Sequence, residues 1–389
     1  MKKNNLCSEI GYMSINHYGE QLCGDHVEIV ENNDSSIIVL ADGLGSGVKA
    51  SILSTLTSKI ISTMLAAGLD IRDAVETIAD TLPICSERKT AFSTFTIIRL
   101  VDNIHADIIQ YENPNVIMLR NGVHYEFPLM TMAIGEKTIY RSTVELADGD
   151  IFVAMSDGIL YASEDGVLNN DWSRDKLIEF LEPLSRAELT AKLLTSIILD
   201  ETNKLYGGKP FDDATACVVK IRQRQTVNIA IGPPEDMSDN HRMMALFFAK
   251  EGKHVVCGGT TAKIAAEYLR VPIKTNSTSP DPDIPPISVI DGVDLTTEGI
   301  ITVDKILSYA TDYVKDNRSF EQWCYKKDGA SLAARLLFED ATDINMFIGH
   351  AANPAHNEMP INFNVKMQIL KKLSKRLREM GKRVKVLDF

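Results

Sequence analysis

The first half of the chain alternates short apolar segments with longer segments of helical periodicity. The short segments are rich in β-branched and apolar residues and end in Asn, Asp or Gly turns, which predicts strands at 36–41, 92–100, 104–110, 116–120, 138–145, 151–155 and 214–221. Two-residue links, Asp102-Asn103 and Asn121-Gly122, separate consecutive segments. Links of this kind predict antiparallel hairpins.

Helical periodicity occurs before and after these strands. Apolar residues recur over 48–65 at the spacing of a helix face, and Gly68 stands where a C-terminal cap is expected. We expect a second helix at about 70–80. Ser185 and Glu188 have capping-box spacing before an apolar helical segment. Runs of strands with helices on either side in sequence predict an α+β sandwich of antiparallel sheets covered by helices.

The order of predicted elements changes after the polar segment 222–225. Predicted strands at 227–231, 254–257, 287–290, 344–348 and 383–387 alternate with predicted helices at about 239–251, 261–269, 302–315, 328–340 and 364–380. This alternation predicts an α/β doubly wound domain with a mainly parallel sheet. The proline-rich segment 274–286 is a loop in this prediction, because the alternation resumes after it. With 389 residues, the chain is long enough for two domains, 1–222 and 226–389.

Composition narrows the classes of function. Acidic residues outnumber basic ones by 53 to 41, for a net charge of -12, which argues against general binding to nucleic acid or anionic membranes. The 6 cysteines have no CxxC or metal-ligand spacing, which suits a reducing compartment. No signal peptide or membrane-spanning apolar run is visible. We therefore expect a cytoplasmic protein, with a homodimer left open.

Acidic residues occur at the predicted strand ends and turns of the first domain. They are Gly24-Asp25, Asp42-Gly43 in LADGLGSG, Asp157-Gly158 in AMSDG, and Asp212-Asp213 in FDDATACVV. Mg²⁺ and Mn²⁺ prefer oxygen ligands, so carboxylates converging from strand ends could hold such ions. Asp-Gly is also a common turn dipeptide, because Gly accepts positive φ. Spacing alone leaves a metal site and a set of ordinary turns both open.

In order and separation, these motifs resemble the PPM-type (protein phosphatase 2C-like) serine/threonine phosphatases, in their bacterial stage II sporulation protein E branch. The resemblance rests on Gly24-Asp25, on LADGLGSG running into a helix, on SDG, and on DDAT before a final strand. It covers about 1–222 and implies an αββα phosphatase sandwich with antiparallel central sheets. The second domain has no recognised family.

The resemblance implies a centre of two Mn²⁺ or Mg²⁺ ions at the edge of the sandwich. The implied ligands are Asp42 bridging both ions, Asp25 and the Gly43 carbonyl on one, and Asp157 and Asp212 on the other, with Asp213 as a candidate beside Asp212. Asp42, Asp157 and Asp212 are the expected catalytic residues. Two close ions lower the pKa of a bridging water and neutralise phosphoryl oxygens, so hydroxide can attack phosphorus without a covalent intermediate.

One position departs from the eukaryotic relatives. They carry a histidine, a candidate general acid, after the Asp-Gly of the bridging motif, whereas this chain has Leu44. Loss of a general acid slows the leaving-group step by about 10²- to 10⁴-fold where it operates. We therefore expect a slow enzyme. His17 and His26 could replace it or could be structural.

The implied function is hydrolysis of phosphoserine or phosphothreonine on a regulatory protein, such as an anti-sigma-factor antagonist. The alternative is a pseudo-phosphatase that serves as a signalling or metabolite-sensing module, although the retained aspartates speak against it. Because the phosphatase motifs begin close to Met1, we expect the second domain or another chain to regulate it.

Polar segments also follow the predicted strands of the second domain. They predict a site for a small phosphorylated or nucleotide-like ligand, made of Gly258, Gly259, Thr260, Thr261, Asp291 and Asn353. A helix that begins in such a segment offers free N–H groups to an anion. A tight turn with a threonine cap would give the same pattern at 257–261, and a complete P-loop or GxGxxG motif is absent. A nucleotide-processing enzyme is a further alternative for this domain.

Overall fold

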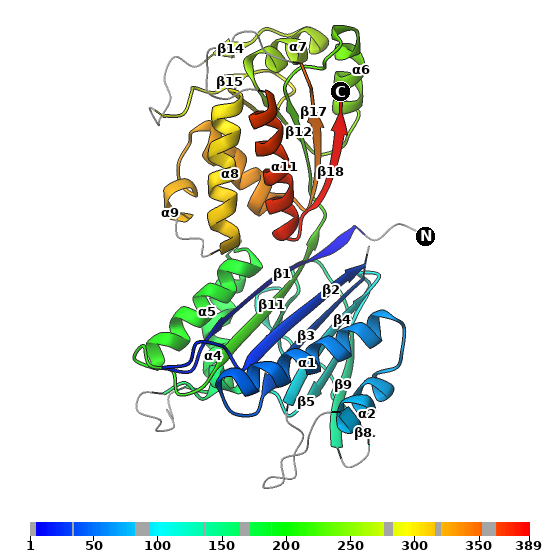
Figure 1. The fold of residues 1–389 in the computed structure, drawn as a ribbon, viewed down its shortest axis with the longest axis vertical. Helices are drawn as coiled ribbons and strands as arrows, with labels where there is room; N and C mark the ends of the chain where they lie inside the picture. Colours follow the sequence, from blue (N-terminus) through cyan, green and yellow to red (C-terminus); the bar gives the residue numbers. More distant parts are fainter. Residues whose placement is uncertain are drawn as a thin grey trace. The chain divides into compact units, whose positions relative to one another are not determined.

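In the computed structural model the chain forms two compact units, Met1–Gln223 and Arg224–Phe389 (Figure 1). The described residues are 5–32, 35–81, 93–134, 137–163, 172–187, 189–275, 283–315, 320–351 and 363–389. The division between the units falls within the polar segment 222–225.

The first unit contains two sheets in which every strand pair is antiparallel, as predicted. The six-stranded sheet has the order β2 (Asp25–Asn32), β3 (Ser35–Gly43), β4 (Ser93–Val101), β5 (His105–Tyr111), β9 (Lys137–Glu145) and β8 (Met130–Ile134). The five-stranded sheet has the order β1 (Leu6–Ile15), β11 (Ala214–Gln223), β10 (Ile151–Met155), β6 (Ile117–Arg120) and β7 (Val123–His124).

Alternating side chains assign the sheets to layers. On β3, Ile38 and Leu40 pack with Phe152 of β10 in the core between the sheets, whereas Val39 packs with helices. The helices on the six-stranded sheet are α1 (Gly47–Ala66) and α2 (Ile71–Thr81). Those on the five-stranded sheet are α4 (Arg174–Ser185) and α5 (Ala191–Leu205). The predicted αββα sandwich is confirmed (Figure 1).

Both predicted hairpin links have the expected backbone. Asp102 and Asn103 each have φ of 50°, and Asn121 and Gly122 have φ of 55° and 78°. Positive φ at both central residues defines the turn whose twist matches paired strands. The link at Asp102 therefore joins β4 to β5, and that at Asn121 joins β6 to β7.

The predicted capping box at Ser185 is wrong. Ser185 is the last residue of α4, and its hydroxyl donates to the Glu182 carbonyl at 2.7 Å. Helix α5 is capped by Thr190, whose side chain accepts from the Leu193 N–H at 3.2 Å. Thr190 has extended backbone, the usual conformation of a cap residue, whereas Ser185 is still helical. Glu188 lies outside the described residues.

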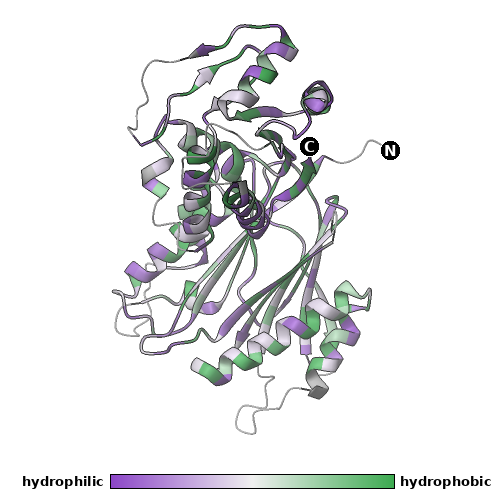
Figure 2. Cartoon of the chain, turned by 45° about the horizontal axis from the view of Figure 1, so that its top comes forward, coloured by the Kyte–Doolittle hydropathy of each residue, from purple (hydrophilic) through white to green (hydrophobic). Residues whose placement is uncertain are grey.

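Helix α1 exposes part of its apolar stripe, and Figure 2 shows hydrophobic residues recurring along its length between polar ones. Val48, Ile52 and Leu56 are exposed. The buried face combines aliphatic side chains with small ones such as Ala50 and Ser54, and the Ser54 hydroxyl donates to the carbonyl of Ser51 at 3.1 Å. Part of the predicted apolar stripe is therefore exposed, because the face turned to the sheet includes small residues as well as aliphatic ones.

The second unit contains a mixed seven-stranded sheet. Its parallel part has the order β16 (Leu295–Thr297), β13 (Lys253–Cys257), β12 (Thr226–Ile231), β17 (Asp343–Ile348) and β18 (Arg383–Asp388). At one edge of the sheet, β15 (Ser288–Val289) pairs antiparallel with β16, and β14 (Lys274–Thr275) pairs antiparallel with β15. The predicted strand at 287–290 thus pairs antiparallel and lies second from the edge of the sheet, and the unpredicted β16 extends the parallel part.

Helices cover both faces of this sheet. One face packs against α6 (Asn240–Phe248) and α7 (Gly259–Leu269). The other packs against α8 (Ile300–Lys315), α10 (Gly329–Ala334) and α11 (Phe363–Glu379), near the short α9 (Phe320–Trp323). The helix predicted at 328–340 is α10 continued by a π-helical segment, Arg335–Asp340. In the described part of the chain, no helix combines the length and apolarity needed to cross a bilayer.

Candidate metal centre

Asp25 and Asp42 face each other across adjacent strands. Asp25 begins β2, Asp42 stands next to the end of β3, and the two residues are paired in the ladder. A hydrogen bond from the Gly43 N–H to the Gly24 carbonyl, at 3.2 Å, joins the two chain segments beside this pair. Two of the predicted carboxylates therefore meet at one end of the six-stranded sheet.

Ser156 connects this pair to the other sheet. Its hydroxyl donates to Asp25 Oδ2 at 2.7 Å and accepts from the Thr215 N–H at 2.9 Å. The next residue, Asp157, begins the short helix α3 (Asp157–Leu160) directly after β10. The ends of β10 and β11 thus bring Asp157 to the carboxylates of the six-stranded sheet. Sequence reasoning missed Ser156 and Thr215, although SDG and DDAT contain them.

Asp212 and Asp213 complete the group from the segment before β11. Asp212 Oδ1 accepts from the Asp213 N–H at 2.9 Å, and Asp213 Oδ1 accepts from the His17 N–H at 2.9 Å. Asp213 is buried, and a Cβ on Gly24 would lie 2.7 Å from its Oδ2. All the predicted aspartates of the first domain therefore lie at one end of the sandwich, at the ends of strands, at the start of α3 or in the segment before β11.

The glycines of the motifs allow close packing here. A Cβ on Gly43 would lie 2.1 Å from the Ala50 carbonyl oxygen, and one on Gly158 would lie 2.2 Å from that of Asp213. Neither glycine is among the described residues with positive φ. The alternative that these Asp-Gly pairs are ordinary left-handed turns is therefore wrong, because what the glycines provide is space for neighbouring backbone.

The carboxylates affect one another through burial and charge. Burial, followed by the charges of Asp25, Asp157 and Asp212, raises the pKa of Asp42 to about 9. Burial and the nearby Asp213 and Asp212 raise the pKa of Asp25 to about 7. Burial and Asp157 raise the pKa of Asp212 to about 6, and burial raises the pKa of Asp157. Such a cluster is stabilised by bound protons or cations.

The donor set fits a hard divalent cation. Asp25 Oδ1 and Asp213 Oδ2 are buried and have no hydrogen-bond partner. A buried charged oxygen is costly unless it is paired or bound to a metal, and carboxylate oxygens suit Mg²⁺ and Mn²⁺. Within the described ranges, no group of three His, Cys, Asp or Glu side chains already surrounds one ion position. Ion binding would therefore require some aspartate side chains to turn inward.

Of the two candidate histidines, His17 lies closer to this cluster. Its backbone binds Asp213, its Nδ1 is buried without a hydrogen-bond partner, and its charged form would lower the pKa of Asp212. His26 instead faces Glu28 at 3.4 Å, and Glu28 pairs with Lys59 at 2.6 Å. His26 thus belongs to a surface ion-pair group.

In the second unit, the segment Gly258 to Thr261 connects β13 to α7. Gly258 has φ of 111° and donates its N–H to the Thr297 carbonyl at 2.9 Å. The predicted threonine cap is wrong, because α7 begins at Gly259 with Gly258 as its cap residue. Thr260 is exposed, whereas the hydroxyl of Thr261 is buried and without a partner. The Glu298 carboxylate would lie 3.6 Å from a Cβ on Gly259.

The structure does not bring Asp291 to this segment. Asp291 precedes β16, and the nearby Asp294 N–H donates to the His254 carbonyl at the start of β13. Because β13 and β16 are parallel, Asp291 lies at their amino ends, whereas Gly258 to Thr261 follow the carboxyl end of β13. Asn353 lies outside the described residues.

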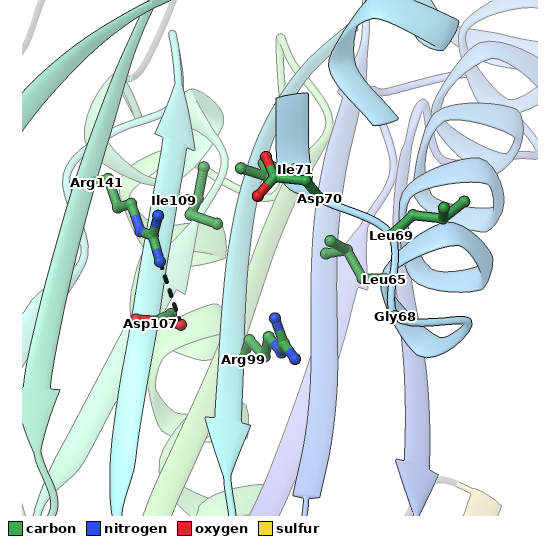
Figure 3. Close-up of a pocket in the computed structure, with 9 residues that line it drawn as sticks. All are labelled: Leu65, Gly68, Leu69, Asp70, Ile71, Arg99, Asp107, Ile109 and Arg141. Atoms are coloured by element: carbon green, nitrogen blue, oxygen red, sulfur yellow. Dashed lines mark ion pairs between the residues drawn. The ribbon is translucent and has the colours of Figure 1, made fainter. Parts of the chain in front are cut away.

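A pocket of about 150 Å³ lies elsewhere, on the helix-covered face of the six-stranded sheet (Figure 3). Arg99, Asp107 and Arg141 line it from three strands, and Arg141 approaches Asp107 at 3.6 Å. The α1–α2 link forms the opposite wall. None of the site aspartates lines this pocket, so it is separate from the candidate metal centre.

Comparison with known proteins identifies relatives for the first unit. The family model for stage II sporulation protein E (SpoIIE) matches residues 32–222. Stage II sporulation protein E of Bacillus subtilis (strain 168) is 27% identical over 190 residues, which are 47% of this chain and 22% of the relative. This chain thus aligns with only about a fifth of that relative's length.

Solved structures also align with this chain. The phosphatase domain of the cell fate determinant SpoIIE from Bacillus subtilis aligns with a TM-score of 0.42 and 21% identity, over 56% of this chain and 94% of that one. The catalytic domain of the serine threonine protein phosphatase PstP, in complex with two manganese ions, aligns with a TM-score of 0.38 and 15% identity, over 56% and 100%.

Proposed function

Because residues 32–222 form a domain of the stage II sporulation protein E family, we propose that this chain is a metal-dependent protein phosphatase that hydrolyses phosphoserine or phosphothreonine. The observation that carries the proposal is the meeting of Asp25, Asp42, Asp157 and Asp212 at one end of the sandwich. Burial raises the pKa of all four, and neighbouring negative charges raise the pKa of Asp25, Asp42 and Asp212 further. A cluster of this kind suits divalent cations, which in turn would bind a phosphoryl group.

Each aspartate has a role in this proposal. Asp42 would hold both ions, Asp25 and the Gly43 carbonyl would hold one, and Asp157 and Asp212 would hold the other, with Asp213 beside them. Two Mn²⁺ or Mg²⁺ ions would neutralise the phosphoryl oxygens and lower the pKa of a water for attack on phosphorus. Ser156 orients Asp25, since its hydroxyl donates to Oδ2 at 2.7 Å.

The substrate in this proposal is a phosphorylated regulatory protein, such as an anti-sigma-factor antagonist. Asp42→Ala should lower Mn²⁺-dependent phosphate release from phosphopeptides and from p-nitrophenyl phosphate by at least about 10²-fold, because it removes the ligand shared by both ions. Asp200→Ala is the matched control, since Asp200 is exposed on α5. Full activity of Asp42→Ala, or activity that persists with a chelator, would contradict the assignment.

A pseudo-phosphatase is the second candidate. The observation that favours it is that no three candidate side chains in the described ranges already surround an ion position. The same assay separates the two: a pseudo-phosphatase shows no phosphate release with Mn²⁺ or Mg²⁺ from any substrate of the panel.

We propose further that the second unit is a doubly wound regulatory domain. Its site for a small phosphorylated or nucleotide-like ligand is the first turn of α7, from Gly258 to Thr261. The unpartnered, buried hydroxyl of Thr261 supports this placement. Ligand binding there would alter metal occupancy at Asp42.

A further inference from the structure

Each loop that carries an aspartate of the metal centre also exposes a large apolar side chain. Leu22, shortly before Asp25, is 48% exposed, and Leu44, shortly after Asp42, is 36% exposed. Tyr161, one turn after Asp157, is 60% exposed, and Phe211, immediately before Asp212, is 48% exposed. Isolated exposed apolar residues are normal, but a group of them around one polar site marks a binding surface.

A backbone hydrogen bond at Tyr161 and a ring contact of Phe211 place these two residues beside the aspartates. The Tyr161 N–H donates to the Asp157 carbonyl at 3.0 Å. The ring of Phe211 lies 6.5 Å from that of Tyr206, whose hydroxyl donates to the Gly158 carbonyl at 2.8 Å. The loops of Asp157 and Asp212 are therefore linked through Tyr206.

Tyr18 extends the same surface. Its N–H donates to the Pro210 carbonyl at 2.7 Å, and its ring, 61% exposed, lies 5.7 Å from the Lys209 ammonium. The preceding residue, His17, donates its N–H to Asp213 at 2.9 Å. Tyr18 is thus anchored on both sides to the segment that carries Asp212 and Asp213.

We propose that Tyr18, Leu22, Leu44, Tyr161 and Phe211 form an apolar rim that binds the residues flanking the phosphorylated side chain of the substrate. This inference rests on the proposed phosphatase function. The occupant is a phosphoserine or phosphothreonine segment with apolar rather than acidic neighbours. Successive residues of an extended peptide lie about 3.3 Å apart, so a phosphoryl group at the aspartates places its neighbours over the adjoining loops.

Charge supports the choice of occupant. The five rim side chains are uncharged and the chain carries a net charge of -12, so acidic residues next to the phosphate would gain no ion pair with the rim side chains and would add negative charge to an acidic protein. The rim supplies apolar contacts, and the Lys209 ammonium already lies over the Tyr18 ring. Apolar neighbours gain contact with the rim without meeting like charge.

The test uses the full chain with Mn²⁺ and two phosphoserine peptides that differ only at the flanking positions, Leu in one and Asp in the other. Wild type should prefer the Leu peptide by about tenfold in kcat/KM, mainly through KM. The double variant Tyr18→Ser/Phe211→Ser should lose this preference, and its kcat/KM for the Leu peptide should fall by about tenfold relative to that for p-nitrophenyl phosphate.

Tyr325→Ser is the control, because Tyr325 is exposed in the second unit and should leave the preference intact. Equal kcat/KM for the two peptides in wild type, or an undiminished preference in the double variant, would overturn the rim while the phosphatase assignment stands. Absence of hydrolysis of every substrate, p-nitrophenyl phosphate included, would instead contradict the proposed function and the rim with it.

Discussion

Gly43 shows at the residue scale how a motif position serves the site. Shortly after Gly43 the chain enters helix α1, and the Ala50 carbonyl oxygen of this helix would lie only 2.1 Å from a Cβ added to Gly43. Asp42 is thereby held between its ladder partner Asp25 and the start of α1. Any side chain at 43 must move the helix relative to the carboxylate.

Gly43→Ala should therefore destabilise the chain and reduce phosphate release together. Inserting a methyl group into packed backbone costs about 1–3 kcal/mol, which corresponds to a fall in melting temperature of several degrees. Thermal melts and Mn²⁺-dependent kcat/KM measure both effects. Ser46→Ala is the control, because Ser46 makes no side-chain cap bond to α1. A fully stable, fully active Gly43→Ala protein would refute the packing argument.

Local rules account for the hairpins and most helices at the element scale. Asn121 and Gly122 adopt positive φ because this turn requires it, and the sequence shows that directly. Strands β1 and β2 were not predicted, although the alternation of apolar and polar residues around Glu9 and Glu28 is a strand signal. Which strands they pair with, β11 and β3, is not revealed by a local pattern.

The first turn of α7 supports a prediction about the second unit. The Thr261 hydroxyl is buried without a hydrogen-bond partner. Thr261→Val should therefore leave the free energy of unfolding of the ligand-free chain unchanged or raise it by up to about 1 kcal/mol, and the melting temperature with it. The same variant should lose the thermal shift that inorganic phosphate or adenosine monophosphate gives wild type, and with it any effect of these ligands on phosphatase rate.

Thr311→Val is the control for that experiment, because Thr311 is exposed on α8 and its hydroxyl binds the Leu307 carbonyl. A ligand shift that survives Thr261→Val unchanged would remove the first turn of α7 from consideration as the site.

At the scale of the whole molecule, the aspartate cluster opposes folding in the absence of ions. The pKa of Asp25 rises from 3.8 to about 7 and that of Asp42 from 3.8 to about 9. At pH values between 3.8 and these raised pKa values, the folded state binds more protons than the unfolded state. The free energy of unfolding therefore falls as the pH rises through this range. Bound divalent cations would take the place of those protons.

We therefore expect chain stripped of divalent ions to melt at a lower temperature at about pH 8 than at about pH 6, and Mn²⁺ to narrow that difference. Asp42→Asn should flatten the pH dependence, since it removes the group with the highest raised pKa. Melting curves with and without Mn²⁺ provide the measurement. An unaltered pH slope in Asp42→Asn would show that other groups govern it.

The sequence by itself determined the local elements and the set of aspartates. Hairpin turns, helix periodicity and the motifs around Asp25, Asp42, Asp157 and Asp212 depend on near neighbours, so they can be read along the chain. The resemblance carried by those motifs agreed with the family model that matches 32–222.

Only the tertiary structure decided how these parts meet. The bond from Ser156 to Asp25 joins residues 131 positions apart, and the separation of Asp291 from Gly258 follows from the parallel pairing of β13 with β16. The charges that raise the pKa of Asp42 likewise belong to Asp25, Asp157 and Asp212, which are distant from one another in sequence. Such features depend on which strands pair and which faces pack, and a local pattern carries no record of contacts formed across the chain.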